Sequence, residues 1–212
     1  MELLSPLRRE EHKALKSISL EGSILDLGGS RFSKYQGLFG GNHQITTVNF
    51  DKNTKPEIFH DLERPLTVES NMYDNVLLIN VLEHIYSYRQ LVEESFRVLK
   101  SGGQTVVAVP FMFPIHPSPS DFQRFTKENL EKLFTEVGFK EIHVQALGSG
   151  VFMTNLGMLD RLMPFPVRIF TSTLGLVLAI ALDWLFTKFA RLVKKKYDPD
   201  TYALGFVLTA KK

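Results

Sequence analysis

Four side chains that accept hydrogen bonds stand at or just after the ends of predicted strands. They are Asp26, Asp51, Asp61 and Asn80. In an open parallel sheet, ligands bind outside the carboxyl ends of the strands, near the point where the strand order reverses. Acceptors gathered there suit a ligand with a cationic amino group, ribose hydroxyls and an exocyclic amine. Carboxylates at the same edge would repel a ligand that carries two phosphates.

The first predicted strand runs into a glycine turn in the stretch ILDLGGSRFS, residues 24–33. Gly28 and Gly29 stand where a missing Cβ lets a ligand approach the backbone. A dinucleotide fingerprint would need glycine at 28, 30 and 33, and the last two positions are serine. This departure argues against a pyrophosphate cradle and a nicotinamide oxidoreductase. A purely structural turn is the alternative, but Asp51 stands 23 residues after Gly28, where an acidic side chain can bind ribose hydroxyls.

The elements that must position these residues alternate between short apolar runs and helix-like segments, which is typical of a parallel α/β sheet. The sequence predicts strands at 23–27, 44–50, 57–61, 73–80, 104–110, 140–147 and 201–212. It predicts helices at 5–18, 32–39, 87–100 and 126–139. We expect Gly102 and Gly103 to end the third of these helices, and Thr126 and Gly138 to cap the fourth. Residues 1–212 are predicted to form a single domain.

Five motifs together resemble class I S-adenosylmethionine-dependent methyltransferases, in particular the subgroup that includes the ubiquinone and menaquinone biosynthesis enzymes. They are ILDLGGS, VNFD, HDLERPL, YDNVLLINVLEHI and RVLKSGG followed by a strand. The resemblance covers roughly residues 20–148 and the final strand. It implies a Rossmann-like, doubly wound, mostly parallel seven-stranded sheet with an antiparallel last strand.

The resemblance also implies S-adenosylmethionine as cofactor and gives a role to each strand-end residue. Asp26 and the turn Gly28–Ser30, with Gly29 between, would border the methionine part. Asp51 would hold the ribose. Asp61 and the backbone of Leu62 would read the adenine, and Asn80 would lie near the sulfonium. Ser30 departs from the family, which usually has glycine at that position.

Methyl transfer to an oxygen acceptor needs a base on a loop at the cofactor edge. His84 and His116 are the candidates, although each has a simpler interpretation, as a helix-start residue and as a solvated loop histidine. Asp121 and Arg124 follow His116 in the loop PFMFPIHPSPSDFQRFT, where they would either contact the substrate or pair with each other. The spacing of His12, His43, His60 and His143 predicts no metal site.

Residues 151–196 form an apolar segment where the family often has a short connection. We expect a helical insertion that serves as a lid over the substrate, an in-plane membrane anchor or a dimer face, or that packs on its own domain. The uncharged run 169–182 has 14 residues, whereas a span needs about 20. A helical wheel puts Asp183, Lys188 and Arg191 in one polar sector opposite Trp184 and its apolar neighbours. We therefore predict peripheral contact with a membrane or a lipid-like ligand, without a crossing.

Composition bounds the remaining possibilities. The net charge of +2 gives no general case for nucleic acid as a partner, and the absence of cysteine removes thiolate chemistry and disulfides. The N-terminal residues lack the apolar core of a signal peptide, so a cytoplasmic location is expected, with peripheral membrane contact through the insertion. The leading hypothesis is methyl transfer from S-adenosylmethionine to a small-molecule or lipid-like acceptor. The alternative is a non-catalytic module of the same fold that serves in binding or as a membrane scaffold.

Overall fold

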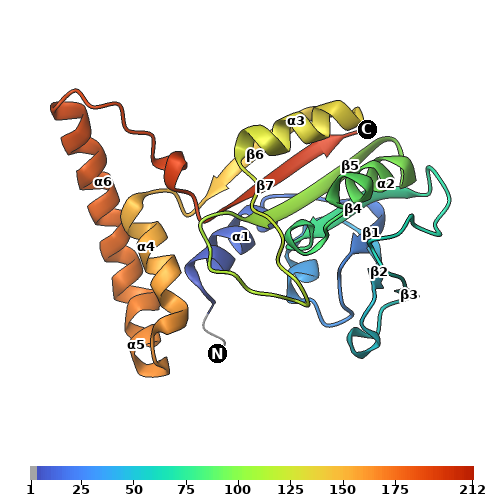
Figure 1. The fold of residues 1–212 in the computed structure, drawn as a ribbon, viewed down its shortest axis with the longest axis horizontal. Coiled ribbons are helices and arrows are strands. Elements are labelled where there is room, and N and C mark those ends of the chain that lie inside the picture. Colours follow the sequence, from blue (N-terminus) through green and yellow to red (C-terminus); the bar gives the residue numbers. More distant parts are fainter. Residues whose placement is uncertain (1–3) are drawn as a thin grey trace.

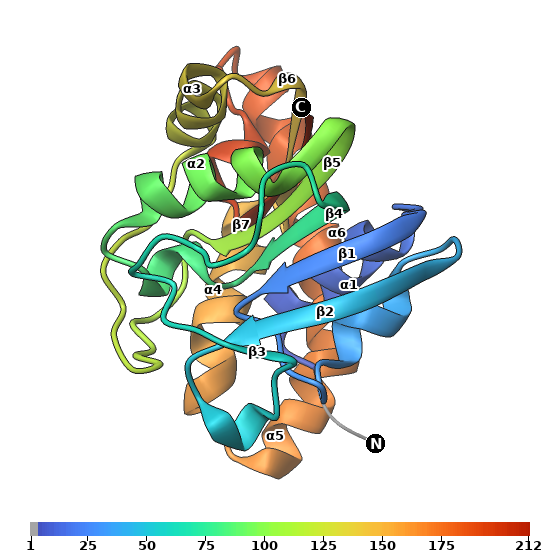
Figure 2. The ribbon, with the colours of Figure 1, turned by 90° about the vertical axis from the view of Figure 1, so that its right-hand side faces the viewer.

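The computed structural model describes residues 4–212. A single seven-stranded sheet has the strand order β3-β2-β1-β4-β5-β7-β6 (Figures 1 and 2). Its strands are β1 (Gly22–Leu27), β2 (His43–Asn49), β3 (Ile58–Phe59), β4 (Tyr73–Ile79), β5 (Leu99–Pro110), β6 (Lys140–Leu147) and β7 (Gly205–Lys211). Neighbouring strands among the first five are parallel, and β7 runs antiparallel to both β5 and β6. All seven predicted strands are present and the last is antiparallel as predicted, although β5 starts earlier than expected, at Leu99, and β7 later, at Gly205.

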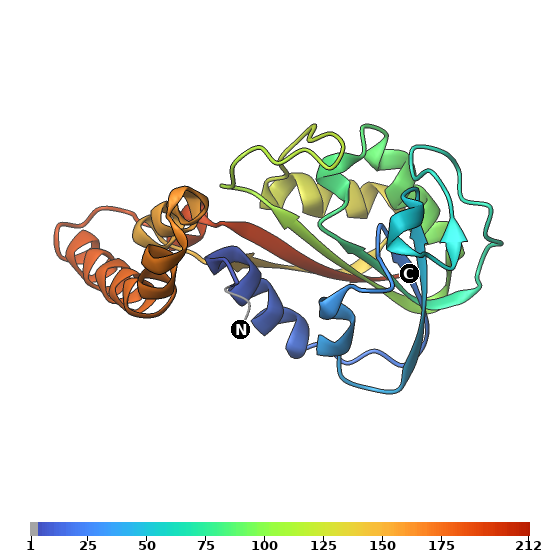
Figure 3. The same cartoon turned by 90° about the horizontal axis from the view of Figure 1, so that it is seen from below.

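Helices cover both faces of the sheet (Figure 3). Helix α1 (Pro6–Lys16) lies on one face, and α2 (Tyr88–Val98) and α3 (Lys127–Val137) lie on the other. Successive side chains of a strand point to opposite faces. In β4, accordingly, Val76 and Leu78 belong to the core under α2 and α3, whereas Leu77 and Ile79 belong to the core under α1. This two-sided burial explains the near-continuous apolar run.

Local signals set the ends of α3 as predicted. The Thr126 hydroxyl accepts a hydrogen bond from the Asn129 amide at 3.2 Å, which satisfies one of the free amides of the first turn. Gly138 follows the last turn with a φ of +113°, a conformation that side chains with a Cβ rarely adopt. The segment 32–39 differs from its prediction, because it forms only a 3-10 turn at Lys34–Leu38.

The predicted end of the helix at 87–100 was wrong. Helix α2 ends at Val98, and Leu99 already pairs with Tyr73 as the first residue of β5. Gly102, with a φ of +77°, and Gly103 thus lie inside the strand, where the register between β4 and β5 shifts. A Cβ on Gly103 would lie 2.9 Å from the Asp74 carbonyl oxygen. The glycine pair serves this irregularity of the strand rather than a helix terminus.

The chain between β6 and β7 forms a helical insertion that projects beyond the edge of the sheet (Figures 1 and 3). It contains α4 (Val151–Leu159), α5 (Phe165–Phe170), a π-helical turn (Thr171–Gly175) and α6 (Leu176–Leu192). Helix α4 packs against α6 and also contacts α1. A helical insertion was predicted, and the structure contains one.

The polar sector drawn for α6 needs a correction at Asp183. This side chain is only 8% exposed and faces α4, where its carboxylate accepts hydrogen bonds from the amides of Phe152 at 3.0 Å and Met153 at 2.9 Å. The free amides at a helix N-terminus stabilise a carboxylate in this way. The Asp183 carboxylate therefore connects α6 to α4 and does not lie on a solvent-exposed face of α6.

The argument from length also needs a correction. A continuous helix runs over Thr173–Leu192, 20 residues that are long and apolar enough to cross a membrane by length and composition. Only 17% of its most apolar window is buried. Large apolar side chains on it face solvent: Leu174, Val177, Leu178, Ile180, Trp184, Leu185, Phe186, Phe189 and Leu192. The structure leaves an extended apolar surface on the insertion.

Candidate functional site

A cleft of about 340 Å³ lies at the carboxyl ends of β1, β2 and β4. The sheet order reverses between β1 and β4, since the chain goes from β1 to β2 on one side and from β4 to β5 on the other. Ligands of open α/β sheets bind at such a switch point. Of the predicted cofactor residues, the cleft is lined by Gly28, Asp51, Leu62 and Asn80.

The glycine turn after β1 is closed by its own hydrogen bonds. Gly28 has a φ of +85°, and a Cβ there would lie 2.6 Å from Cγ2 of Val81. The Ser30 hydroxyl accepts a hydrogen bond from the Phe32 amide at 3.0 Å, so the serine takes part in the turn. Asn49 was missed by the sequence analysis. It lines the cleft, and its Nδ2 donates to the carbonyls of Gly28 at 3.0 Å and Gly29 at 3.1 Å.

Asp26 lies beneath the turn and does not line the cleft. Its fully buried carboxyl group accepts hydrogen bonds from the Tyr35 hydroxyl at 2.9 Å and from Gln36 Nε2 at 2.8 Å. A Cβ on Gly29 would lie 2.2 Å from Asp26 Oδ2, so the turn rests directly on this carboxyl group. Desolvation by burial raises the pKa of Asp26 to about 6, although the two hydrogen bonds oppose the rise. The arrangement suits a positioning residue of the turn.

The two other acidic residues differ in their placement. Asp51 lines the cleft, and its Oδ1 accepts hydrogen bonds from Asn53 N and Nδ2, both at 2.9 Å. Both bonds use Oδ1, which leaves Oδ2 for a ligand. Asp61 accepts from the Glu63 amide at 3.1 Å and does not line the cleft, whereas its neighbour Leu62 is buried in the cleft wall.

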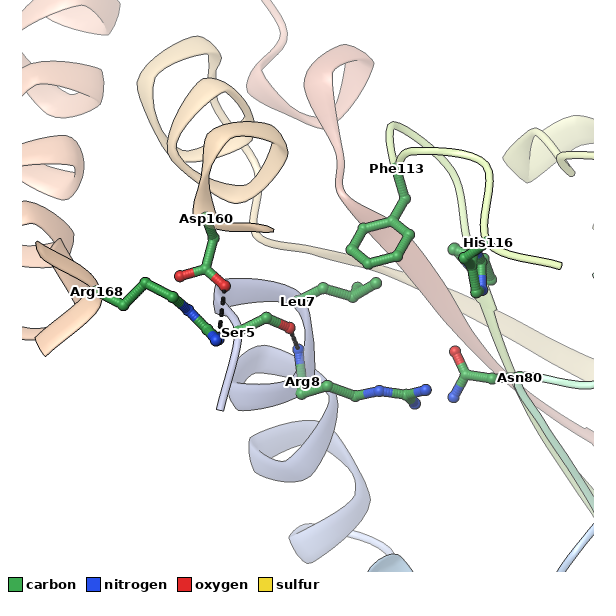
Figure 4. Close-up of a pocket in the computed structure, with 9 residues that line it drawn as sticks. Ser5, Leu7, Arg8, Asn80, Phe113, His116, Asp160 and Arg168 are labelled. Atoms are coloured by element: carbon green, nitrogen blue, oxygen red, sulfur yellow. Dashed lines mark hydrogen bonds and ion pairs between the residues drawn. The ribbon is translucent and has the colours of Figure 1, made fainter. Parts of the chain in front are cut away.

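Figure 4 shows the residues around a second cavity, which has a volume of about 210 Å³. It is lined by Ser5, Leu7, Arg8, Asn80, Pro110, Phe113, His116, Asp160 and Arg168. Arg8, Asn80 and His116 also line the cleft, so the two cavities share one wall. Asp160 and Arg168 come from the insertion and form an ion pair at 3.0 Å. The sequence analysis missed Arg8, Asp160 and Arg168, since their spacing gives no sign that they converge.

Asn80 is held at this shared wall by an unexpected partner. It follows β4 with a φ of +52°, and its Nδ2 donates to Oε2 of Glu11 in α1 at 2.8 Å. Glu11 is buried, and its Oε1 also accepts from Arg8 Nη1 at 2.8 Å. Helix α1 therefore fixes two of the three side chains that both cavities share.

The two candidate bases lie close together. The rings of His84 and His116 form an edge contact with centroids 5.1 Å apart. Both side chains line the cleft, and Glu83 is buried beside them, with its Oε1 3.7 Å from each Nε2. The expectation of no metal site considered four other histidines and not this group, whose ligand atoms all lie within 4.8 Å of one another.

Asp121 and Arg124 pair with each other, which is one of the two interpretations weighed for them. Arg124 Nη2 donates to Asp121 Oδ2 at 2.7 Å and to the Pro114 carbonyl at 3.3 Å. The hydrogen bonds from Arg124 hold the pKa of Asp121 well below its usual range. Asp121 Oδ2 also accepts from the His116 amide at 2.8 Å. Neither residue lines either of the two cavities, so the pair supports the loop that carries His116.

Comparisons with known proteins agree with this geometry. Residues 27–107 match the family model of a methyltransferase domain. No curated protein sequence matches the chain. The structure is similar to phosphoethanolamine N-methyltransferase 2 of Haemonchus contortus in complex with S-adenosyl-L-methionine, with a TM-score of 0.58 and 17% identity over 95% of this chain and 52% of that one. This chain thus spans about half the length of the nematode enzyme.

Two other solved structures of methyltransferases match this chain along nearly their whole length. An S-adenosylmethionine-dependent methyltransferase from Mesorhizobium loti has a TM-score of 0.60 and 15% identity over 96% of this chain and 98% of that one. One from Archaeoglobus fulgidus has a TM-score of 0.56 and 16% identity over 97% and 91%. The TM-scores support the shared fold. Because the sequence identities are so low, the resemblance to the ubiquinone and menaquinone biosynthesis enzymes stays a prediction. Residues 27–107 match the model of a methyltransferase domain, and the chain has the same Rossmann-like fold as these S-adenosylmethionine-dependent methyltransferases.

Proposed function

We propose that the protein transfers a methyl group from S-adenosylmethionine, bound in the cleft at β1, β2 and β4, to a small-molecule or lipid-like acceptor in the adjoining cavity. The observation that carries the proposal is the wall that the two cavities share, formed by Arg8, Asn80 and His116. Methyl transfer depends mainly on bringing a nucleophile into line with the donor carbon. Two adjoining cavities with one common wall suit that requirement.

The residues of the cleft fit the cofactor. Gly28 lines the cleft, Asp51 offers Oδ2 to ribose hydroxyls, and Leu62 gives an apolar surface for the adenine. When bound, S-adenosylmethionine supplies an electrophilic methyl group on its sulfonium. Ser30 supports a non-catalytic relative less than its departure from the family pattern suggested, because its hydroxyl accepts a hydrogen bond inside the turn.

The insertion supports a lipid-like acceptor and contact with a membrane. Arg168 of α5 lines the acceptor cavity, while Phe165 and Phe170 of the same helix are exposed. Because α5 contributes both to the cavity wall and to the exposed apolar surface of the insertion, an amphipathic molecule held at that surface would lie near the cavity. Location on the cytoplasmic side of a membrane remains a prediction.

The connections of α6 favour an in-plane position over a crossing. Both neighbours of the insertion, β6 and β7, belong to the sheet, so a crossing helix would need a second segment to return. Helix α4, which packs against α6, has nine residues and a length of about 14 Å, far less than the hydrocarbon core of about 30 Å. Basic residues follow α6 at Lys194–Lys196, as at the polar side of an interfacial helix.

Calorimetry tests the cofactor. S-adenosylmethionine and S-adenosylhomocysteine should bind, and NAD should not. Asp51→Ala should weaken binding by roughly 1–3 kcal/mol, because the ribose hydroxyls lose a charged acceptor. Glu69→Ala, an exposed carboxylate in the loop before β4, is the matched control and should leave the affinity unchanged. Equal affinity of the Asp51 variant, or binding of NAD alone, would contradict the proposal.

A further inference from the structure

Glu83 is a buried carboxylate whose two oxygens have no hydrogen-bond partner in the described structure. It lies in the 3-10 turn Leu82–His84 that follows β4, beside the wall of the cleft. A buried charge without a partner costs several kcal/mol, and such groups normally pair with a cation or coordinate a metal ion. No described side chain or amide hydrogen-bonds either oxygen, which leaves both free to coordinate a bound cation.

The two neighbouring histidines are oriented as metal ligands are. His84 Nδ1 lies 2.6 Å from the Ser120 carbonyl oxygen, and His116 Nδ1 lies 3.1 Å from that of Pro114. A carbonyl only accepts, so each Nδ1 is the donor, and in the neutral form of each ring the lone pair is then on Nε2. Both Nε2 atoms lie 3.7 Å from Oε1 of Glu83. Metal-binding histidines typically donate their other ring N–H to a carbonyl or carboxylate in this manner.

The distances favour an ion between these atoms over a direct proton bridge. A separation of 3.7 Å exceeds the usual N–H···O range of about 2.7–3.2 Å. Metal–ligand lengths of about 2.0–2.2 Å at tetrahedral angles give ligand–ligand separations of about 3.4 Å. The two Nε2–Oε1 separations are within a few tenths of an ångström of this value, and all the ligand atoms lie within 4.8 Å of one another.

We propose that Glu83, His84 and His116 bind one divalent first-row transition-metal ion. Two imidazoles and one carboxylate are ligands that suit Zn²⁺ and its neighbours in the series rather than Mg²⁺ or Ca²⁺. Three protein ligands leave a coordination position open, as in catalytic rather than structural zinc sites. His84 and His116 line the cleft and His116 also lines the acceptor cavity, so this open position is next to both.

The loop 111–125 is built to hold His116 at this site. Gln123 Nε2 donates to the carbonyls of Leu82 at 2.7 Å and Ile85 at 2.8 Å, which fastens the loop on both sides of Glu83 and His84. The Asp121 carboxylate accepts from the His116 amide and lies 3.3 Å from His116 Nδ1. A carboxylate behind a ligating histidine fixes its orientation and raises its basicity as a ligand.

Metal binding by untagged, chelator-treated protein tests the proposal. Titration with Zn²⁺ should give one site per chain in calorimetry, and Co²⁺ should give visible absorption bands of a low-symmetry site. His116→Ala and Glu83→Gln should each weaken Zn²⁺ binding more than about tenfold. His143→Ala removes an exposed histidine of β6 and should bind as the wild type does.

Circular dichroism of each variant establishes that it is folded, and His116→Ala serves if Glu83→Gln is not. Absence of stoichiometric binding by the folded wild type would overturn the proposal, and so would equal affinity of folded His116→Ala. Binding of S-adenosylmethionine, measured separately, keeps a failure of the metal site distinct from a failure of the proposed function.

Discussion

Asp26→Asn should change how the stability of the protein depends on pH. Burial raises the pKa of Asp26 to about 6 in the folded chain, against 3.8 for an exposed aspartate. The folded state therefore binds more protons than the unfolded state between these values, and the free energy of unfolding falls as the pH rises through that window. A shift of about two units at 1.36 kcal/mol each amounts to about 3 kcal/mol.

The observable is the difference between variant and wild type, because other titrating groups cancel in it. The free energy of unfolding of Asp26→Asn minus that of the wild type should rise by about 3 kcal/mol from pH 3 to pH 7, mostly between pH 4 and 6. Urea unfolding followed by circular dichroism at several pH values measures it.

Asp74→Asn is a control of opposite sign. The hydrogen bond from Lys100 lowers the pKa of Asp74 to about 2, so its stabilisation is lost as the pH falls from about 4 to 2. Its difference curve should be flat between pH 4 and 7. A flat or falling curve for Asp26→Asn would refute the reasoning. It would mean that the hydrogen bonds from Tyr35 and Gln36 outweigh burial and hold the carboxylate charged.

Three further results are expected. Asp183→Ala should destabilise α4 by roughly 1–3 kcal/mol, because two amides lose a charged acceptor, and hydrogen exchange in 151–159 that matches the wild type would contradict this. His116→Ala should lower turnover by more than about tenfold once an acceptor is known, because this side chain lines both cavities, while a smaller loss would remove the residue from the chemistry. The protein should co-sediment with anionic liposomes and be partly released by salt, and the emission of the exposed Trp184 should shift to the blue; emission that is already blue and unchanged by lipid, without sedimentation, would mean that α6 packs on its own domain or on a second copy.

The elements that sequence predicted well are those whose signals are local. The run 73–80 is apolar because β4 is covered on both faces, and α3 carries both of its caps in its own sequence. The predictions that were wrong depended on contacts far along the chain. Gly102 and Gly103 look like a helix terminus until the pairing of Leu99 with Tyr73 makes them part of a strand.

The site was predicted in part for the same reason. Asp51 and Asn80 follow strands whose ends the pattern locates, and both line the cleft. The prediction for Asp183 was wrong because a helical wheel places charged side chains in solvent. In the structure, the amides at the N-terminus of α4 donate hydrogen bonds to the Asp183 carboxylate instead. His84 and His116 were weighed one at a time as bases, because their convergence on Glu83 depends on how the loop 111–125 folds back.

Glu11 shows how an element outside the strand pattern becomes part of the site. A buried carboxylate on the face of α1 that packs against the sheet is unfavourable unless it is paired. Arg8, one turn earlier, and Asn80, 69 residues later, supply its hydrogen bonds. The same two side chains line both cavities. The hydrogen bonds of one buried carboxylate therefore connect α1 to the end of β4, and they hold two of the side chains in the wall that the two cavities share.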